Sequence, residues 1–233
     1  RPGGHRGGAA AHHQRGRAGA RAHADRRRVA QQPDPHPVRD LEGAERAVVR
    51  GGPHLQHGQQ PLQAASGPNQ GWSCDFMSDA LWSGRRFRTF NVIDEYNREG
   101  LRIEIDTSLP ASRVIRALSE LVEVRGAPLF IRLDNGPEFI AHALTEWAQS
   151  KGIALKHIQP GKPTQNAFIE SFNGRARDEC FNENWFLGLR DARTTIETWR
   201  RDYNANRPHS AHGELTPAEF ALQWSATHQP KVA

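Results

Sequence analysis

The segment PLFIRLDNGPEF, residues 128–139, passes from apolar to polar within a few positions. Its first half, PLFIRL, is an apolar run of strand length and predicts a short buried strand. Asp134 follows that strand, and the DNG word predicts a turn, because Asp, Asn and Gly tolerate turn conformations. A helix is expected over about residues 138–151, closed by the glycine that follows. The segment therefore places a carboxylate where a buried strand meets a turn.

Three β-strands are expected upstream of this segment. They are WSCDFMS (72–78), FRTFNVID (87–94) and GLRIEI (100–105), whose residues alternate or favour strands. The words SGRR and EYNR separate them and read as turns. Short connections of this kind join neighbouring antiparallel strands, so these three strands form a meander.

Helices and one further strand complete the pattern. ASRVIRALSELVEVRG (111–126) places its apolar residues on one helical face, and IALKHI (153–158) is the fifth strand. A loop and helix follow over residues 161–179, and apolar positions spaced by three and four predict a helix from Leu189 to Tyr203. The order β-β-β-α-β-α-β-α-α predicts an α/β fold, a mixed five-stranded sheet flanked by helices.

The first 66 residues differ in composition from the rest. They contain no aromatic residue, Ile, Lys or Met, so they cannot bury enough apolar surface to offset the entropy of ordering. We expect a disordered low-complexity segment over residues 1–66, a folded core with C-terminal helices over residues 67–223 and a tail over residues 224–233.

Two origins of the low-complexity segment stay open. Translation of GC-rich coding DNA out of frame explains its Arg, Ala, Gly and Pro, and an Arg-rich arm that binds DNA is the alternative. Its paired histidines, at 12 and 13 and at 54 and 57, have no cysteine at zinc-site spacing, so we expect no metal there.

Charge and cysteine content limit the function classes. The net charge of +5 divides into +6 for residues 1–66 and −1 for residues 67–233, so the core must bind any phosphate through local clusters. Cys74 and Cys180 are too few for a disulfide framework. No apolar run approaches the ~18 residues of a membrane span, so we expect a cytoplasmic protein with no membrane partner.

Three carboxylates lie at informative places in the predicted sheet. Asp75 lies inside the first strand, Asp134 follows the fourth, and Glu170 lies on the helix after the fifth. If they converge, each pair repels by about 4 kcal/mol at about 4 Å and an effective dielectric of about 20. A cation relieves this repulsion, and oxygen ligands favour magnesium or manganese. Two such ions about 3.5 to 4 Å apart serve in-line attack at phosphorus.

Several words of the sequence resemble the integrase-type DDE transposases of bacterial insertion sequences, in the retroviral-integrase superfamily. The resemblance spans about residues 69–223, and 35 residues separate Asp134 from Glu170, the spacing typical of that family. The matching words are WSCD (72–75), DNGPEF (134–139), GKPTQNAFIESFNGRARDEC (161–180), YNANRPHS (203–210) and TPAEF (216–220).

The resemblance implies a ribonuclease-H-like fold and a two-step reaction on DNA. Asp75, Asp134 and Glu170 would hold two magnesium or manganese ions as the catalytic set, with no other cofactor. The first step nicks DNA at the element's end, and the second joins that 3′ end to target DNA without ATP or a covalent protein intermediate. Element ends and target DNA are the expected partners, and reaction at two ends implies a homo-oligomer.

The resemblance also implies basic residues that meet DNA phosphates. Lys162, Arg175 and Arg177 surround the candidate site in the sequence, and we expect them to bind the DNA backbone rather than read bases. Ordinary solvated surface is the simpler interpretation of these side chains.

Other acids and histidines have simpler interpretations. Asp79 competes with Asp75 for the first metal position but adjoins a turn, and Asp94 is assigned to the turn after its strand. His157 is expected in the core or at the sheet edge. His212 stands where relatives carry Leu, which predicts a less stable C-terminal lobe if that position is buried.

Two alternatives to the transposase remain. One is a ribonuclease-H-like nuclease that only hydrolyses, and the other is an inactive remnant that only binds DNA. The tail words YNANRPHS and TPAEF favour the transposase, whereas the upstream DNA-end-binding region of relatives has no counterpart in residues 1–66.

Overall fold

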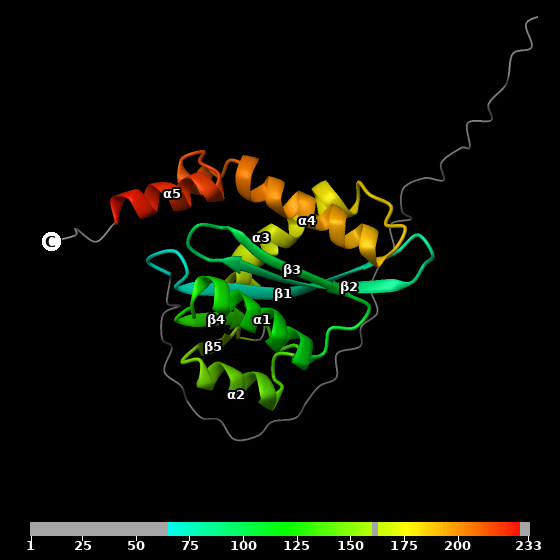
Figure 1. Ribbon diagram of the computed structural model, residues 1–233, viewed down its shortest axis with the longest axis horizontal. Coiled ribbons are helices and arrows are strands. Elements are labelled where there is room, and N and C mark those ends of the chain that lie inside the picture. Colours follow the sequence, from blue (N-terminus) through cyan, green and yellow to red (C-terminus); the bar gives the residue numbers. More distant parts are fainter. Residues whose placement is uncertain (1–64, 160–162, 229–233) are drawn as a thin grey trace, which may run out of the picture. The chain divides into compact units, whose positions relative to one another are not determined.

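One five-stranded sheet organises the residues that the computed structural model describes, 65–159 and 163–228. The expectations for the low-complexity segment up to residue 64, for Lys162 and for the last five residues lie outside them. The strand order is β3-β2-β1-β4-β5 (Figure 1). The strands are β1 (Gly71–Ala80), β2 (Arg86–Asp94), β3 (Gly100–Asp106), β4 (Phe130–Leu133) and β5 (Ala154–His157).

The sheet is mixed, as the sequence predicts. β1 pairs antiparallel with β2, and β2 pairs antiparallel with β3, which confirms the meander. β4 lies parallel to β1, and β5 lies parallel to β4. Parallel neighbours need long crossover connections, and the helices between these strands supply them.

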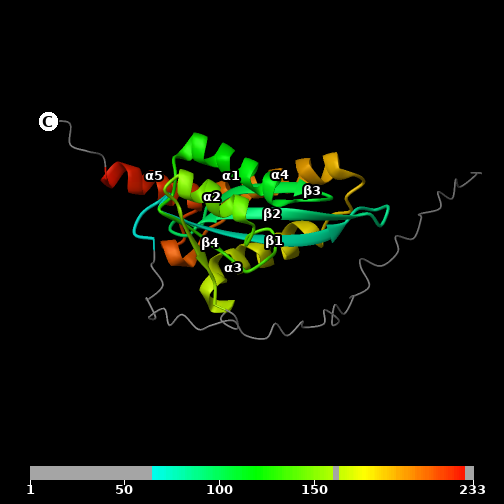
Figure 2. The same cartoon turned by 90° about the horizontal axis from the view of Figure 1, so that it is seen from below.

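The helices cover both faces of the sheet (Figures 1 and 2). They are α1 (Ala111–Arg125), α2 (His142–Ser150), α3 (Ala167–Ala176), α4 (Leu189–Asn206) and α5 (Pro217–Thr227). Short helical segments are η1 (Pro163–Asn166), the π-helical η2 (Arg177–Phe181) and η3 (Ser210–His212). The boundary expected at residue 223 falls inside α5.

Alternate residues of β1 and β2 divide between two hydrophobic cores. Trp72, Cys74 and Phe90 pack with the buried faces of α1 and α2. Met77 and Phe87 pack on the other face of the sheet with η2 and α4. Because side chains alternate along a strand, Asp75 shares the second face, the face that α3 also covers.

A buried ion pair connects β4 to the turn after β2. Arg132 Nε donates to Glu95 Oε1 over 2.6 Å, and the hydroxyl of Ser73 donates to the same carboxylate oxygen. Arg132 and Glu95 are almost fully buried, so their hydrogen bonds offset the loss of hydration. The predicted buried strand thus accommodates a basic residue in its interior.

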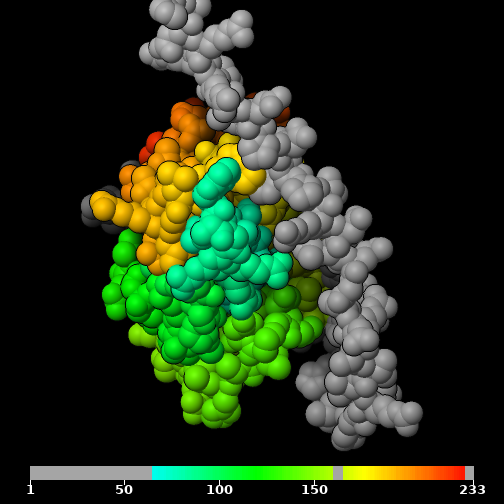
Figure 3. Space-filling view, turned by 90° about the vertical axis from the view of Figure 1, so that its right-hand side faces the viewer, coloured from blue at the N-terminus to red at the C-terminus, as the bar shows by residue number. Residues whose placement is uncertain are grey.

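The turn between β1 and β2 packs against the segment that leads into α4 (Figure 3). The amide of Trp82 donates to the carbonyl of Phe186 over 2.8 Å, and the ring of Trp82 meets that of Trp185 edge to face. This contact joins the meander to the C-terminal helices.

The predicted helix at residues 138–151 begins later than expected, at His142. The amides of Phe139 and Ile140 both donate to the carbonyl of Gly136, so the chain turns there, and Ala141 has an extended backbone. Phe139 is fully buried and stacks on Phe76 with ring centroids 4.9 Å apart. Tertiary packing of one aromatic ring therefore overrides the local helical pattern.

Both cysteines are free and buried. Burial raises the pKa of Cys180 to about 12, so this thiol stays protonated at neutral pH. Over the ranges that the structure describes, every helix is too short or too polar to cross a membrane.

Candidate active site

The parallel pairing of β1 with β4 determines where the first two carboxylates lie. Trp72 pairs with Ile131, and Ser73 pairs with Arg132. Two residues further along each strand, this register leads from Ser73 to Asp75 on β1 and from Arg132 to Asp134, which lies just after β4. Adjacent strands are about 4.8 Å apart, so this register brings two residues distant in sequence to neighbouring positions at one edge.

Asp75 is half-buried and held by two hydrogen bonds. Its Oδ1 accepts from the amide of Phe76 over 2.8 Å, and its Oδ2 accepts from Asn173 Nδ2 over 2.9 Å. The pKa of Asp75 is raised to about 6 by burial in the first place and also by the charges of Asp134 and Glu170, while the two hydrogen bonds oppose the increase. The ionised form of Asp75 is therefore disfavoured unless a positive charge is nearby.

Asp134 and Glu170 approach Asp75 from a loop and from a helix. Asp134 Oδ1 accepts from the amide of Gly136 over 2.9 Å, which holds the turn predicted at the DNG word. Glu170 lies exposed in the first turn of α3. Both charges act on Asp75, yet among the described residues no three acids, histidines or cysteines are grouped closely enough to form a metal site.

Asn173 is a site residue that sequence reasoning did not assign. Its Nδ2 donates to Asp75, and its Oδ1 accepts from Asn91 Nδ2 over 2.7 Å. Asn91 is the register partner of Asp75 on β2, so Asn173 connects α3 to both strands. The available signal was its spacing, because it lies about one helical turn after Glu170 on the same side of α3.

Two family models, both described as "Integrase core domain", match residues 65–163 and 151–217. The chain belongs to the integrase core domain family. A protein of insertion element IS407 from Burkholderia multivorans is 48% identical over 175 residues, which cover 75% of this chain and 63% of that protein. The chain thus spans less than two thirds of the length of this relative.

Solved structures agree with the integrase fold. A simian T-cell lymphotropic virus intasome, solved in complex with a PP2A regulatory subunit, matches with a TM-score of 0.60 at 19% identity, over 78% of this chain and 62% of that one. The HTLV-2 integrase catalytic core domain in complex with magnesium matches with a TM-score of 0.52 at 18% identity, over 67% of this chain and 98% of that one. The ribonuclease-H-like fold that the sequence predicts is confirmed.

Arg177 of this integrase core is engaged within the protein. Its Nη1 bonds to Asp79 Oδ2 over 2.8 Å, and its Nη2 donates to the carbonyl of Ser78 over 2.8 Å. Its guanidinium also lies over the ring of Phe181. The side chain is 36% exposed, so part of it still faces solvent. Asp79, the sequence competitor of Asp75, thus binds an arginine that connects β1 to η2.

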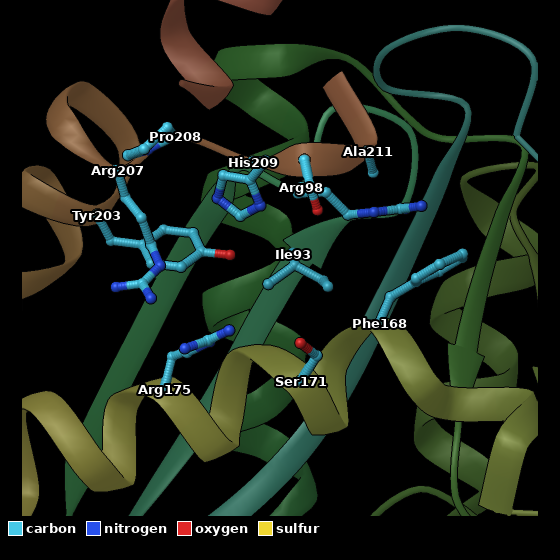
Figure 4. A pocket seen from close by; sticks show the side chains of 11 residues that line it. Ile93, Arg98, Phe168, Ser171, Arg175, Tyr203, Arg207, Pro208, His209 and Ala211 are labelled. Atoms are coloured by element: carbon cyan, nitrogen blue, oxygen red, sulfur yellow. The ribbon is translucent and has the colours of Figure 1, made fainter. Parts of the chain in front are cut away.

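Arg175 points to the other side of α3 from Asn173. It lines a cavity together with Arg98 and Arg207 (Figure 4). Of the basic residues expected near the integrase site, Arg175 and Arg177 therefore lie in different surroundings, and Lys162 is outside the described residues.

Two simpler interpretations agree with the structure. Asp94 accepts hydrogen bonds from the amides of Tyr96 and Asn69 and thereby holds the turn after β2, which confirms its assignment to the turn. His157 is exposed on the edge strand β5, with its Nδ1 3.1 Å from the carbonyl oxygen of Asp134. Its expected place at the sheet edge is confirmed.

His212 is not fully buried. Its ring stacks on that of Phe220, with centroids 4.0 Å apart, but its Nε2 is buried without a hydrogen-bond partner. The stacking replaces part of the apolar contact that a leucine would make, and the unpaired nitrogen disfavours burial.

The chemistry of the integrase site fits a divalent cation. The three carboxylates offer only hard oxygen ligands, which magnesium and manganese prefer. A cation beside Asp75 would also stabilise the carboxylate that burial and two like charges now disfavour. The donor type of these residues therefore suits such ions, while the described structure does not group the three acids closely enough to hold one.

Proposed function

We propose that this integrase core cuts DNA at the ends of an insertion element and joins those ends to target DNA, with two magnesium or manganese ions held by Asp75, Asp134 and Glu170. The observation that carries the proposal is the parallel register of β1 and β4, which leads to Asp75 and Asp134 at neighbouring positions, with α3, the helix of Glu170, bonded to Asp75 through Asn173. The charges of Asp134 and Glu170 both disfavour the ionised form of Asp75, and a cation bound by the three acids would relieve this repulsion. The magnesium in the HTLV-2 integrase core structure supports the choice of ion.

The first step hydrolyses one phosphodiester bond, and the second exchanges one phosphodiester bond for another. In the first, water attacks phosphorus at the element's end, the P–O3′ bond breaks, and a free 3′-hydroxyl remains. In the second, that hydroxyl attacks a target phosphorus and a target 3′-oxygen leaves, so the number of phosphodiester bonds is conserved and no ATP is needed. The bound ions would supply positive charge to the attacking and leaving oxygens.

The protein's own residues orient this site. Asn173 holds Asp75 Oδ2 from one side, and the amide of Phe76 holds Oδ1, so the carboxylate has little freedom to rotate. The amide of Gly136 holds Asp134 in the same way. Carboxylates fixed in this manner lose less entropy when they bind ions.

The basic side chains would bind DNA phosphates. Arg175 has no carboxylate beside it in the cavity that it lines, so it is the best placed of them. Arg177 uses two of its five N–H donors on Asp79 and Ser78, which leaves donors for a phosphate on its exposed side. Lys162 completes the proposed set.

The partners follow from the reaction. Two element ends must be processed together, so we propose a homo-oligomer assembled on DNA in the cytoplasm. The HTLV-2 integrase core has been solved in a dimeric form, which supports self-association of this fold.

The test uses the purified chain with a labelled duplex that carries an element end and a second, unlabelled target duplex. We expect magnesium-dependent nicked and joined products, resolved by size on a denaturing gel, and no product in EDTA. A pre-nicked duplex with a free 3′-hydroxyl tests joining separately from nicking. Nicking without joining would instead favour a nuclease that only hydrolyses. No product from either duplex would favour an inactive remnant.

A further inference from the structure

A cavity of about 320 Å³ opens on the side of α3 that carries Ser171 and Arg175 (Figure 4). It lies between α3, the turn after β2 and the segment that follows α4, so three regions distant in sequence form its wall. Its lining residues are Ile93, Arg98, Phe168, Ser171, Arg175, Tyr203, Arg207, Pro208, His209, Ser210 and Ala211.

The charge of this cavity is positive. Arg98, Arg175 and Arg207 line it from three elements, and none of its lining residues is acidic. Arg207 bonds to Glu179 outside the lining, so that arginine is partly neutralised. Two guanidinium groups, those of Arg98 and Arg175, have no ion pair with an acid among the described residues. The cavity therefore favours an anion.

Arg98 combines a left-handed backbone conformation with a buried, unpaired guanidinium nitrogen. Its backbone has a φ of 61°, a left-handed conformation that costs a non-glycine residue about 1 to 2 kcal/mol. Its guanidinium lies 3.4 Å from the centroid of the Phe168 ring, and its Nη1 is buried with no hydrogen-bond partner. Burial lowers the pKa of Arg98. A strained backbone beside a buried, unpaired charged donor is typical of a functional site.

Neutral donors complete the wall of the cavity. Ser171 lies one turn before Arg175 on α3, and Figure 4 shows both side chains directed into the same space. His209 has a buried Nε2 with no partner, and its ring meets that of Tyr203 edge to face. Burial and nearby positive charges lower the pKa of His209 to about 4, so the ring is neutral at pH 7 and can donate one hydrogen bond.

We propose that this cavity binds the phosphate group of a nucleotide through Arg98 and Arg175, with Ser171 and His209 as neutral donors. Guanidinium groups match phosphate oxygens with two parallel hydrogen bonds, and hydroxyl and imidazole donors satisfy the remaining oxygens. The volume exceeds that of a phosphate alone and accommodates the attached sugar, with the Phe168 and Tyr203 rings beside it.

The phosphate has two chemical sources, a DNA strand or a free nucleotide. DNA follows from the proposed function, on which this part of the inference rests. Because α3 carries Glu170 and Asn173 on one side and Ser171 and Arg175 on the other, a strand that passes over this helix would contact both sites. The cavity would then anchor the DNA beside the carboxylates without taking part in the reaction.

The experiment measures binding by the full chain in EDTA, so that no reaction occurs. The probe is a fluorescein-labelled single strand of about 20 nucleotides, enough to span one such binding surface, read by anisotropy, with thymidine 5′-monophosphate as the competitor. We expect Arg98→Gln and Arg175→Gln each to raise the Kd for the strand roughly tenfold, because each removes a charged hydrogen bond. Each should also reduce the salt slope by about one.

Two further variants make the test decisive. Arg190→Gln is the matched control, because Arg190 lies on α4 and outside the cavity; it should change the Kd by less than about twofold. Ser171→Asp places a carboxylate in the cavity from an exposed helix position and should weaken binding even if Arg98→Gln fails to fold. Circular dichroism melts check the fold of each variant.

The outcomes separate the two sources and the two proposals. Displacement of the strand by the mononucleotide, reduced in Arg175→Gln, would identify a site for free nucleotides. Arginine-dependent strand binding with no displacement would identify a site for a DNA phosphate. If Arg175→Gln and Ser171→Asp bind both probes like Arg190→Gln, the inference is wrong. If the unmodified chain does not join DNA but its strand binding depends on the arginines, only the proposed function is refuted.

Discussion

Helix α3 separates two regions of opposite charge. On one side, Asn173 bonds to Asp75, and the charges of Asp134 and Glu170 act on the same carboxylate. On the other side, Arg175 lines a cavity with two more arginines and no acid. A helix of ten residues thus presents a site that favours cations and a site that favours anions.

The difference between the two sides of α3 suits two different ligands, a cation on one side and an anion on the other. Burial and two nearby negative charges disfavour the ionised form of Asp75, which suits the cation-binding role proposed for that side. Arg98 and Arg175 form no ion pair within the described residues, which suits the phosphate-binding role proposed for the other side. Variants on the two sides should therefore affect different measurements.

The largest effect is expected on the carboxylate side. Glu170→Gln should lower the rates of nicking and joining by roughly 10³-fold, because a lost cation ligand removes several kcal/mol of stabilisation at the reacting phosphorus. Its Kd for DNA in EDTA should change by less than about twofold. Glu183→Gln, at an exposed acid away from α3, is the control. A parallel loss of binding in Glu170→Gln would remove the distinction between the two sides.

A smaller effect is expected for the residue that orients Asp75. Asn173→Ala should lower the rate of joining by about 10- to 100-fold, as is typical for partners of metal-binding side chains. Its hydrogen bond lowers the pKa of Asp75, so its removal should move the acidic limb of the pH–rate profile to higher pH. Asn182→Ala, at an exposed asparagine beyond η2, should leave the profile unchanged. An unshifted profile in Asn173→Ala would contradict the positioning role.

Ionisation of Asp75 should lower the stability of the metal-free protein, whereas the proposed reaction uses the ionised carboxylate. The pKa of Asp75 in the folded protein, about 6, exceeds its ordinary value of 3.8. The protonated carboxyl therefore contributes to the free energy of unfolding in full below about pH 4, and this contribution is lost as pH rises through about 6. At pH 7 the ionised group then destabilises the metal-free fold by about 3 kcal/mol. Asp75→Asn should therefore raise the Tm at pH 7 by roughly 6 to 12 °C in EDTA.

Magnesium and pH supply the controls for that measurement. Millimolar magnesium should raise the Tm of the unmodified chain by mass action but should have little effect on Asp75→Asn. The difference in Tm between the two proteins should vanish near about pH 4, where the carboxyl is protonated in the folded protein. Asp178→Asn, at an exposed acid in η2, should show neither effect. A destabilised Asp75→Asn at pH 7 would mean that the carboxylate stabilises the fold instead.

The smallest effect is expected from removal of residues 1–66. Both sides of α3 are built from residues beyond that segment, and the first strand begins at Gly71. A chain that starts at Gly67 should melt within about 1 °C of the full chain and bind the single strand with the same Kd. A lower Tm, or weaker binding, would assign the segment a role in the fold or on DNA.

The sequence predicted most of the fold, and it named three carboxylates whose role as metal ligands stays a prediction. Alternating and apolar runs located all five strands, and the DNG word located the turn at Asp134. The start of α2 was wrong because the burial of Phe139 against Phe76 outweighs the helical pattern of the intervening residues. Local patterns cannot reveal such a contact, since the two rings are far apart in the chain.

The sequence alone determined which residue types are present and how they alternate along each strand and helix. It therefore indicated the α/β class, the family and the three acids, because side-chain periodicity and spacing are local properties. Only the tertiary structure decided that Asn173 bonds to Asp75, that Arg177 binds Asp79, and that Arg98 shares a cavity with Arg175. Those pairs depend on the register of the strands and on how α3 packs on the sheet, and the free energy that selects both comes from burial of residues throughout the core.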